Sequence, residues 1–353
     1  MVPSADGSGR ALCAIHVHSS YSDGSAALGA IVDDARAAGI DVLMITDHHT
    51  MAAARHGWAG WQDGVLVIVG YEHSDPLDEN HLLVFGLPQP LDPTLPADRY
   101  VGEAVRAGAT VFAAHPVERR VPRGRIRAYP WTAGADLPFQ GLEVWNFMSL
   151  WVERLSRSRM LLNYLRPGLT GERPDPETLA LWDRCAETRP VAGIAGLDAH
   201  ALKMRWGPVT LTLFSHTRHF QGPLTLVETA TPLSRRDAPA DTRLILTHLA
   251  RGNALMGIPR LGPLDKVNAT VDGRVGPVWG ETFVHQPGME LGIEAPLRVR
   301  FRLVRAGHVR REAQGRQARF RLTEPGLYRV ELLRRRGVVW ALTNHFRVLT
   351  RPP

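Results

Sequence analysis

Short apolar runs recur along the first two hundred residues, and most of them end in polar side chains. The runs are rich in aliphatic and β-branched residues, which is typical of strands buried on both faces of a parallel sheet. We expect such strands over residues 11–15, 42–45, 65–70, 111–114 and 191–197.

Segments with the apolar spacing of a helix lie between these runs. Leu28, Ile31, Val32 and Ala35 share one face of a predicted helix, and Gly39 is placed to end it. The same spacing predicts further helices over residues 100–107, 176–185 and 243–250. Strands that alternate with helices predict an α/β fold with a parallel sheet or barrel.

Metal-binding side chains fall where these strands end. In parallel α/β folds the carboxyl ends of the strands meet on one face, and chemistry is done there. Burying an imidazole or a carboxylate is costly unless a partner or a metal replaces its water. The candidate ligands are His16, His18, Asp23, His48, Glu72, His81, His115, Asp198 and His200.

The pattern changes near residue 264. Runs such as LRVRFRLV and LYRVELL alternate apolar and charged residues between Gly, Pro or polar turns, which is typical of short antiparallel strands. We therefore expect an α/β domain over residues 1–264 and a small all-β, sandwich-like domain over residues 265–353.

Composition favours a reducing compartment. The chain has 353 residues but only two cysteines, Cys13 and Cys185, which are too few for a disulfide framework. The first residues, MVPSADGSGR, lack the apolar core of a secretion signal, and no apolar stretch has the length of a membrane span. We expect a cytoplasmic protein without a membrane partner.

The formal net charge of +7 bears on the choice of partner. Of the 42 basic residues, Lys203 and Lys266 are the only lysines. Many arginines lie in the last third of the chain, where they either cover a solvated face or bind an anionic partner. Because no basic stretch is interleaved with aromatic residues, a small anionic or aryl ester substrate is favoured over nucleic acid. The oligomeric state cannot be read from the sequence.

The candidate ligands combine imidazole and carboxylate without thiolate. This mixture suits Zn, Mn or Fe, and carboxylates can bridge two ions. His16 and His18 stand two apart at a strand end, so the alternation of a strand places both on one side. Ions that lie close together can hold a hydroxide at neutral pH and clamp both oxygens of a displacement at phosphorus. We expect two to three divalent ions and a metal-dependent hydrolase.

Four short motifs, in a fixed order, carry a family resemblance. They are His16-Val17-His18-Ser19 with Ser22-Asp23-Gly24, then Thr46-Asp47-His48, then His115-Pro116, then Asp198-Ala199-His200. In this order they resemble the PHP (polymerase and histidinol phosphatase) superfamily. The resemblance implies a distorted seven-stranded (β/α)7 barrel, up to three metal ions and phosphoester hydrolysis.

The resemblance also assigns ligands to individual ions. It implies a first ion held by His16, His18 and Asp198, a second held by His81 and His115 with Glu72 bridging to the first, and a third held by Asp23, His48 and His200. Some members of the family carry His where this chain has Asp23. Asp47 is expected to orient a neighbouring histidine rather than to bind metal.

A second, weaker resemblance is to the CehA/McbA-type metallohydrolases. It rests on Gly141-Leu142-Glu143-Val144-Trp145-Asn146, on Leu181-Trp182-Asp183 and on the C-terminal β region. That branch includes an aryl carbamate hydrolase, so the resemblance implies a carbonyl carbon as an alternative electrophile.

The expected mechanism is attack by a metal-bridging hydroxide on a phosphoester. We expect Glu72, Asp198 and His200 to be catalytic. The expected substrate-binding residues are Arg119, Arg120 and Arg123, whose forked donors suit phosphate, together with Glu143 and Asn146. The alternatives are an aryl carbamate or ester hydrolase, a nucleic-acid-processing, exonuclease-like protein, and a metal-stabilised binding protein.

Overall fold

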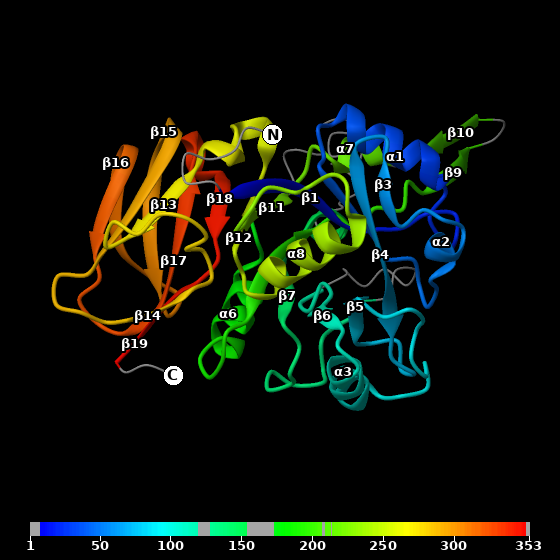
Figure 1. Ribbon diagram of the computed structural model, residues 1–353, viewed down its shortest axis with the longest axis horizontal. Helices are drawn as coiled ribbons and strands as arrows, with labels where there is room; N and C mark the ends of the chain where they lie inside the picture. Colours follow the sequence, from blue (N-terminus) through cyan, green and yellow to red (C-terminus); the bar gives the residue numbers. More distant parts are fainter. Residues whose placement is uncertain (1–7, 119–127, 154–172, 207–208, 213, 351–353) are drawn as a thin grey trace.

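The computed structural model describes residues 8–118, 128–153, 173–206, 209–212 and 214–350, and it divides visibly into two parts (Figure 1). The first part holds the helices α1 (Leu28–Ala37), α2 (Ala52–Arg55), α3 (Ala97–Arg106), α4 (Phe147–Glu153), α6 (Pro176–Cys185), α7 (His216–His219) and α8 (Ala238–Ala250). Its strands are β1 (Gly9–Val17), β2 (Val42–Ile45), β3 (Gly60–Gln62), β4 (Val65–Ser74), β5 (His81–Phe85), β6 (Thr110–Ala113), β7 (Gly141–Asn146), β8 (Ala192–Gly196), β9 (Lys203–Trp206), β10 (Val209–Thr212), β11 (Leu224–Thr229) and β12 (Ala254–Gly257).

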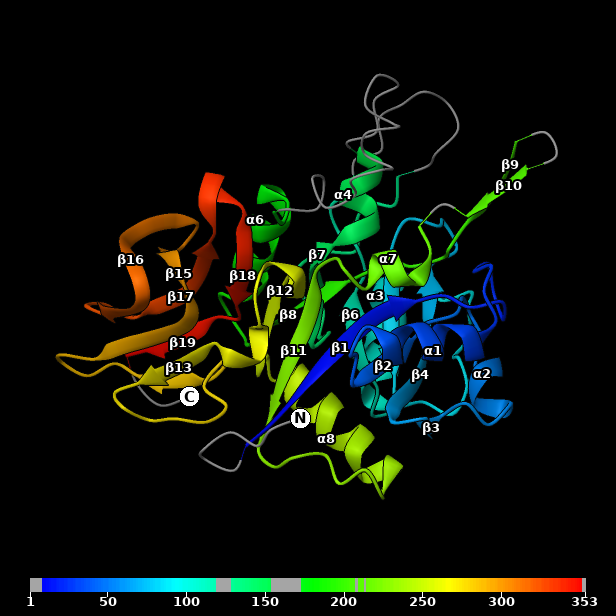
Figure 2. The same ribbon diagram turned by 90° about the horizontal axis from the view of Figure 1, so that it is seen from above.

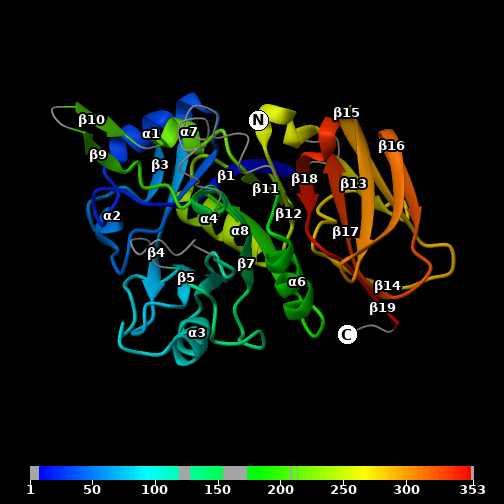
Figure 3. The ribbon, with the colours of Figure 1, turned by 180° about the vertical axis from the view of Figure 1, so that it is seen from behind.

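The second part is built from strands. They are β13 (Asn268–Val271), β14 (Thr282–Val284), β15 (Glu290–Arg305), β16 (His308–Arg321), β17 (Gly326–Leu333), β18 (Val339–Thr343) and β19 (Phe346–Leu349). Seen from behind, α6 lies between the two parts (Figure 3). Seen from above, the β9–β10 hairpin projects from the first part, away from the second (Figure 2).

Helix ends follow local signals in the sequence. The Asp175 side chain accepts hydrogen bonds from the backbone N–H groups of Glu177 and Thr178, and so starts α6 at Pro176 as expected. The helix expected over residues 243–250 begins earlier, at Ala238, because Asp237 caps it by accepting the N–H of Ala240. A cap residue therefore sets this start, which apolar spacing alone placed too late.

The sheet of the first part is mixed. β1, β2 and β4 pair in parallel, as do β6, β7 and β8, whereas β5 pairs antiparallel with both β4 and β6. The segment that follows β8 joins the end of β1 through a single bridge, from Ala199 to Val17, and a few backbone hydrogen bonds. The α/β class is confirmed, but the closed seven-stranded barrel is not and stays a prediction.

β4 changes partners halfway along its length. Its residues pair with β2 up to Val69 and with β5 from Gly70 onwards. An added Cβ at Gly70 would lie 2.4 Å from the backbone oxygen of Val84, so only glycine fits this crossing. Beyond the crossing, the last residues of β4, among them Glu72, pair with β5 instead of β2.

Both faces of the central strands are buried. One face, which includes Cys13, Met44, Ile68 and Phe85, packs with α8 in one apolar cluster. The opposite face packs with apolar residues of α1, α3 and α6 in another. This double burial explains why the strands read as continuous apolar runs.

The C-terminal strands pack around a core of their own, which includes Phe301, Val330 and Trp340. They are antiparallel except for the parallel pair β14–β19. The expectation of short strands is wrong for β15 and β16, which run for 16 and 14 residues because β15 pairs with β13 and then with β17. The division at residue 264 stays a prediction, and the pairing of β12 with β18 crosses it.

Polar side chains join the two parts. Asn344 accepts the N–H of Gly193 at 2.7 Å and donates to the carbonyl oxygens of Gly193 and Ala254. Arg329 of β17 pairs with Asp183 of α6 at 2.5 Å, and His345 donates to the same carboxylate at 2.8 Å. Burial opposes ionisation of Asp183, but His345 and Arg329 hold the pKa of this carboxyl below its usual range.

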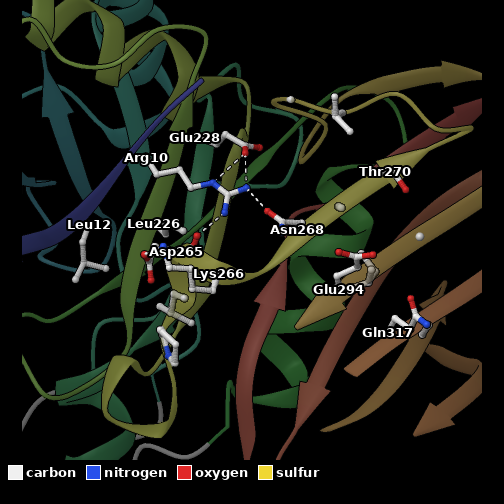
Figure 4. Close-up of a pocket in the computed structure, with 18 of the residues that line it drawn as sticks. Arg10, Leu12, Leu226, Glu228, Asp265, Lys266, Asn268, Thr270, Glu294 and Gln317 are labelled. Carbon is white, nitrogen blue, oxygen red and sulfur yellow. Dashed lines mark hydrogen bonds and ion pairs between the residues drawn. The ribbon is translucent and has the colours of Figure 1, made fainter. Parts of the chain in front are cut away.

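Arg10 makes a second junction, at one side of a groove of about 1160 Å³ between the two parts (Figure 4). Its guanidinium donates to Glu228 at 2.8 Å and to Asn268 at 2.9 Å. It also donates to the carbonyl oxygens of Asp265 and Val267. Arg10 therefore ties β1 and β11 to the start of β13. Among the residues described, no helix combines the length and apolar character needed to cross a bilayer.

The ion pair between Arg329 and Asp183 should stabilise the protein strongly, because both side chains are largely buried. Arg329→Met is expected to lower the free energy of unfolding by about 3–5 kcal/mol, the usual cost of leaving one charge of a buried pair alone. Urea denaturation measures this loss.

Arg319→Met is the matched control, because it breaks an exposed ion pair with Glu290 in the same part of the protein. Its loss should stay below about 1 kcal/mol. Equal losses in the two variants would show that burial does not set the value of the Asp183 pair.

Candidate metal centre

The nine candidate ligands meet in one place and form three overlapping groups. In each group the ligand atoms all lie within 4.8 Å of one another. The groups are His16, His18, Glu72 and Asp198; then Glu72, His81 and His115; then His18, Asp23, His48 and His200. Glu72 belongs to two groups and His18 belongs to two, so the three groups form one continuous cluster.

Glu72 lies at the middle of this cluster and is 1% exposed. Its Oε2 is 2.9 Å from Nε2 of His16 and 3.1 Å from Nε2 of His18. Its Oε1 is 2.8 Å from Nδ1 of His81 and 3.2 Å from Nε2 of His115. The two carboxylate oxygens therefore face different sets of imidazoles.

Strand alternation delivers Glu72 and His81 to the cluster. Glu72 continues the face of β4 that carries Leu66 and Ile68, and His81 begins the face of β5 that carries Leu83 and Phe85. These apolar residues belong to the core cluster that packs with α8. The metal-binding side chains thus cap the end of a dry core, where water competes weakly for them.

Three of the ligands have left-handed backbones. The φ angles are 66° at His16, 26° at His115 and 53° at Asp198. Such angles are uncommon for residues other than glycine, and strained residues of this kind gather at functional sites. The rings of His16 and His18 do lie together, 5.1 Å apart, but a register shift after Ile15 brings them there rather than a regular strand.

Glu143 lies behind His16. Its Oε1 is 2.8 Å from Nδ1 of His16, and its Oε2 accepts the backbone N–H of His115 and the amide of Asn146. An imidazole that donates Nδ1–H to a carboxylate presents an unprotonated Nε2 on its other side. Glu143 was expected to bind substrate, but this placement favours a role in orienting His16.

Gly196 makes this contact with His16 possible. An added Cβ at Gly196 would lie 1.6 Å from Oε1 of Glu143. Asn146, the other residue expected to bind substrate, is buried and accepts the N–H of Ser149 near the start of α4. The approach of Gly196 to Glu143 is not visible in the spacing of the sequence, because β7 and β8 are far apart along the chain.

The third group lies nearest to solvent. The side chain of Asp23 is 54% exposed, and its Oδ2 is 3.2 Å from Nε2 of His200 and 3.7 Å from Nε2 of His48. His200 donates Nδ1–H to the carbonyl oxygen of Asp198 at 3.0 Å, which turns its Nε2 towards Asp23. The open side of the cluster is therefore the side of Asp23.

The expectation that Asp47 orients a neighbouring histidine is wrong, although Asp47 belongs to none of the three groups of candidate ligands. Its carboxylate accepts hydrogen bonds from the N–H and hydroxyl of Ser19 and from the hydroxyl of Ser22. Asp47 therefore holds the loop between His18 and Asp23 instead of orienting a histidine. Arg119, Arg120 and Arg123 lie outside the described residues.

The side chains fit divalent ions. Three buried imidazole nitrogens make no hydrogen bond within the described part of the chain. They are both ring nitrogens of His18 and Nδ1 of His115. Nε2 of His18 is close to Glu72 but lies off the direction of a hydrogen bond. Buried imidazole nitrogens rarely stay unpaired. A divalent ion would accept their lone pairs together with those of the nearby carboxylate oxygens.

The charges of the cluster shift its pKa values in opposite directions. Burial would lower the pKa of His115 and of His200. Glu72 and Glu118 nevertheless raise the pKa of His115 to about 9, and Asp198 and Asp23 raise that of His200 to about 9. Burial and the neighbouring His200 lower the pKa of His18 to about 4.

The carboxylates of the cluster stay ionised. Burial would raise the pKa of Glu72, but the charges of His16 and His48 hold it well below its usual range. Burial likewise opposes ionisation of Asp198, whose pKa is lowered by His16 and His200. At neutral pH the metal-free cluster therefore holds anionic carboxylates beside protonated His115 and His200, whereas His18 is neutral.

Sequence reasoning also missed an aromatic neighbour. The ring of Tyr129 lies 4.6 Å from that of His81 and 6.2 Å from that of His115. Tyr129 is half-buried beside the second group. No motif in the sequence pointed to Tyr129.

Part of the chain is similar to a known protein family. Residues 14–114 match the family model of the PHP domain. This segment includes His16, His18, Asp23, His48, Glu72 and His81, and it ends one residue before His115. A search among curated proteins found no match.

Two solved structures are similar to all or part of this chain. A two-domain protein from Bacteroides vulgatus ATCC 8482, described as containing a predicted PHP-like metal-dependent phosphoesterase, is 18% identical, with a TM-score of 0.50 and coverage of 98% of each chain. An amidohydrolase from Chromobacterium violaceum, solved with bound sulfate and no metal, is 16% identical, with a TM-score of 0.34 and coverage of 65% of this chain and 96% of its own. The chain thus shares its fold with the Bacteroides protein, and residues 14–114 are similar to the PHP domain.

Proposed function

We propose that this protein is a metal-dependent phosphoesterase with three ion sites. The observation that carries the proposal is the sharing of Glu72, whose two buried oxygens face two different sets of imidazoles. If two divalent ions were bound, this carboxylate would be shared between them. Bound divalent ions would polarise the phosphoryl oxygen and lower the pKa of a water molecule.

Each of the three groups would hold one ion. His16, His18 and Asp198 would hold the first ion, and His81 and His115 the second, with Glu72 shared between them. Asp23, His48 and His200 would hold the third. Zn, Mn and Fe all suit these nitrogen and oxygen donors.

Substrate would approach from the side of Asp23. That carboxylate is the most exposed member of the cluster, whereas Glu72 and His16 are closed off from water. Asp198 lies between the two regions, with its Oδ1 3.5 Å from Nε2 of His16 and 3.4 Å from Nδ1 of His200. We therefore expect substitutions of Glu72, Asp198 or His200 to lower turnover.

A phosphoester is favoured over a carbonyl substrate on two grounds. The Bacteroides structure with the same fold is described as containing a predicted PHP-like metal-dependent phosphoesterase. A cluster of many imidazoles and few carboxylates becomes strongly cationic once it binds divalent ions, which favours an anionic substrate. An aryl carbamate or ester remains the alternative, because activated water also attacks carbonyl carbon.

Glu72→Gln should remove hydrolysis of bis(p-nitrophenyl) phosphate. The amide cannot supply two anionic oxygens to two ions, so metal content and turnover should fall together. The loss in kcat/KM should exceed roughly 100-fold, the upper range for residues that only support a ligand. Stopped p-nitrophenol assays and metal analysis of the same samples measure both quantities.

Glu187→Gln is the control, because Glu187 is exposed and outside the cluster. It should leave both quantities unchanged. Full turnover by Glu72→Gln with normal metal content would contradict the assignment. Hydrolysis of p-nitrophenyl acetate or of an aryl carbamate, without any hydrolysis of phosphodiesters or phosphomonoesters, would replace the phosphoesterase by the carbonyl alternative.

Metal binding should release protons at neutral pH. His115 and His200 have pKa values of about 9 in the metal-free protein, and an imidazole must lose a proton before it binds a cation. The apparent affinity for Mn²⁺ should therefore rise with pH up to about 9 and level off above it. Calorimetric titration at pH 7 in buffers of different ionisation enthalpy should show uptake of protons by the buffer. An enthalpy that is independent of the buffer would contradict this charge state.

A further inference from the structure

Asp78 lies on the outer side of His81. Its Oδ1 is 3.2 Å from Nε2 of His81, while Nδ1 of the same ring is 2.8 Å from Oε1 of Glu72. Nδ1 therefore faces the second group of the cluster, and Nε2 faces Asp78. A carboxylate beside one ring nitrogen holds the proton there and leaves the other nitrogen free to bind a cation.

The loop around Asp78 is built to hold it in this position. Asp78 has a left-handed backbone, with φ at 53°, and its N–H donates to the carbonyl oxygen of Asp75 at 2.8 Å. The carboxylate of Asp75 accepts the N–H of Glu79 and the amide of Asn80. The turn is thus closed by three hydrogen bonds to Asp75.

A second contact fixes the turn to the neighbouring loop. The side-chain oxygen of Asn80 accepts the backbone N–H of Thr132 at 2.6 Å and that of Ala133 at 3.0 Å. Tyr129, whose ring packs on His81, belongs to the same loop. His81 is consequently held between Glu72, Asp78 and Tyr129.

The arrangement mirrors that of His16 with the opposite nitrogen. His16 has Nδ1 on Glu143 and Nε2 on Glu72, whereas His81 has Nε2 on Asp78 and Nδ1 on Glu72. Glu143 is buried, but the side chain of Asp78 is 45% exposed. The second group therefore has an orienting carboxylate that reaches solvent.

We propose that Asp78 is a positioning residue that sets the tautomer of His81 for the second ion. The inference rests on the proposed function, because it requires the cluster to bind metal. Asp78 acts through His81 and is not itself a ligand. Its removal should weaken one ion site and leave the others intact.

The test is a calorimetric titration of the metal-free full chain with Mn²⁺. Asp78→Ala should weaken the affinity of one ion site by roughly 10–100-fold, the range for partners of ligating histidines. Asp78→Asn should recover most of the loss, because its amide oxygen can still accept Nε2–H and asparagine tolerates a left-handed backbone. Recovery by Asp78→Asn distinguishes positioning from a general loss of folding.

Asp63→Ala is the matched control. Asp63 also has a left-handed backbone, with φ at 46°, and lies in an exposed turn before β4. The Asp63→Ala variant should bind Mn²⁺ with the affinity of the unaltered chain. If Asp78→Ala and Asp63→Ala gave equal binding isotherms, the role of Asp78 would be overturned but the proposed function would not. Failure of the unaltered chain to bind Mn²⁺ would overturn the proposed function and this inference with it.

Discussion

The structure depends on how one buried carboxylate is compensated. Glu72 has almost no access to water, yet five imidazoles lie within 3.7 Å of its two oxygens. Burying such a charge is costly unless partners surround it. Those partners come from β1, β5 and the segments after β1, β2 and β6, so the ends of several strands must meet at one point. The mixed sheet and the crossing of β4 at Gly70 achieve this meeting.

The backbone around the cluster shows what this convergence requires. His16, His115 and Asp198 take left-handed angles, and Gly196 leaves room for the Glu143 carboxylate that orients His16. These are local costs, and the buried apolar layers on both faces of the strands offset them. Polar junctions of Arg10, Arg329 and Asn344 join the C-terminal strands to the first part of the protein.

Much of this could be predicted from the sequence. The central strands and the helix α1, which ends just before Gly39, follow directly from apolar spacing. The ligand candidates follow from their places at strand ends. The crossing of β4, the contact of Glu143 with His16 and the lengths of β15 and β16 could not be predicted, because each depends on pairing between distant segments. Asp47 was misassigned for a related reason: its motif suggested a histidine partner, but the loop folds Ser19 and Ser22 onto it.

The central claim is that the cluster assembles around several ions. The most direct test is the metal content per chain, measured by plasma mass spectrometry on protein purified without chelators or metal-binding tags. The account predicts two to three equivalents of Zn, Mn or Fe. Less than one equivalent, even after metal is added back and the excess removed, would contradict it and favour a binding protein whose histidines and carboxylates serve only to stabilise the fold.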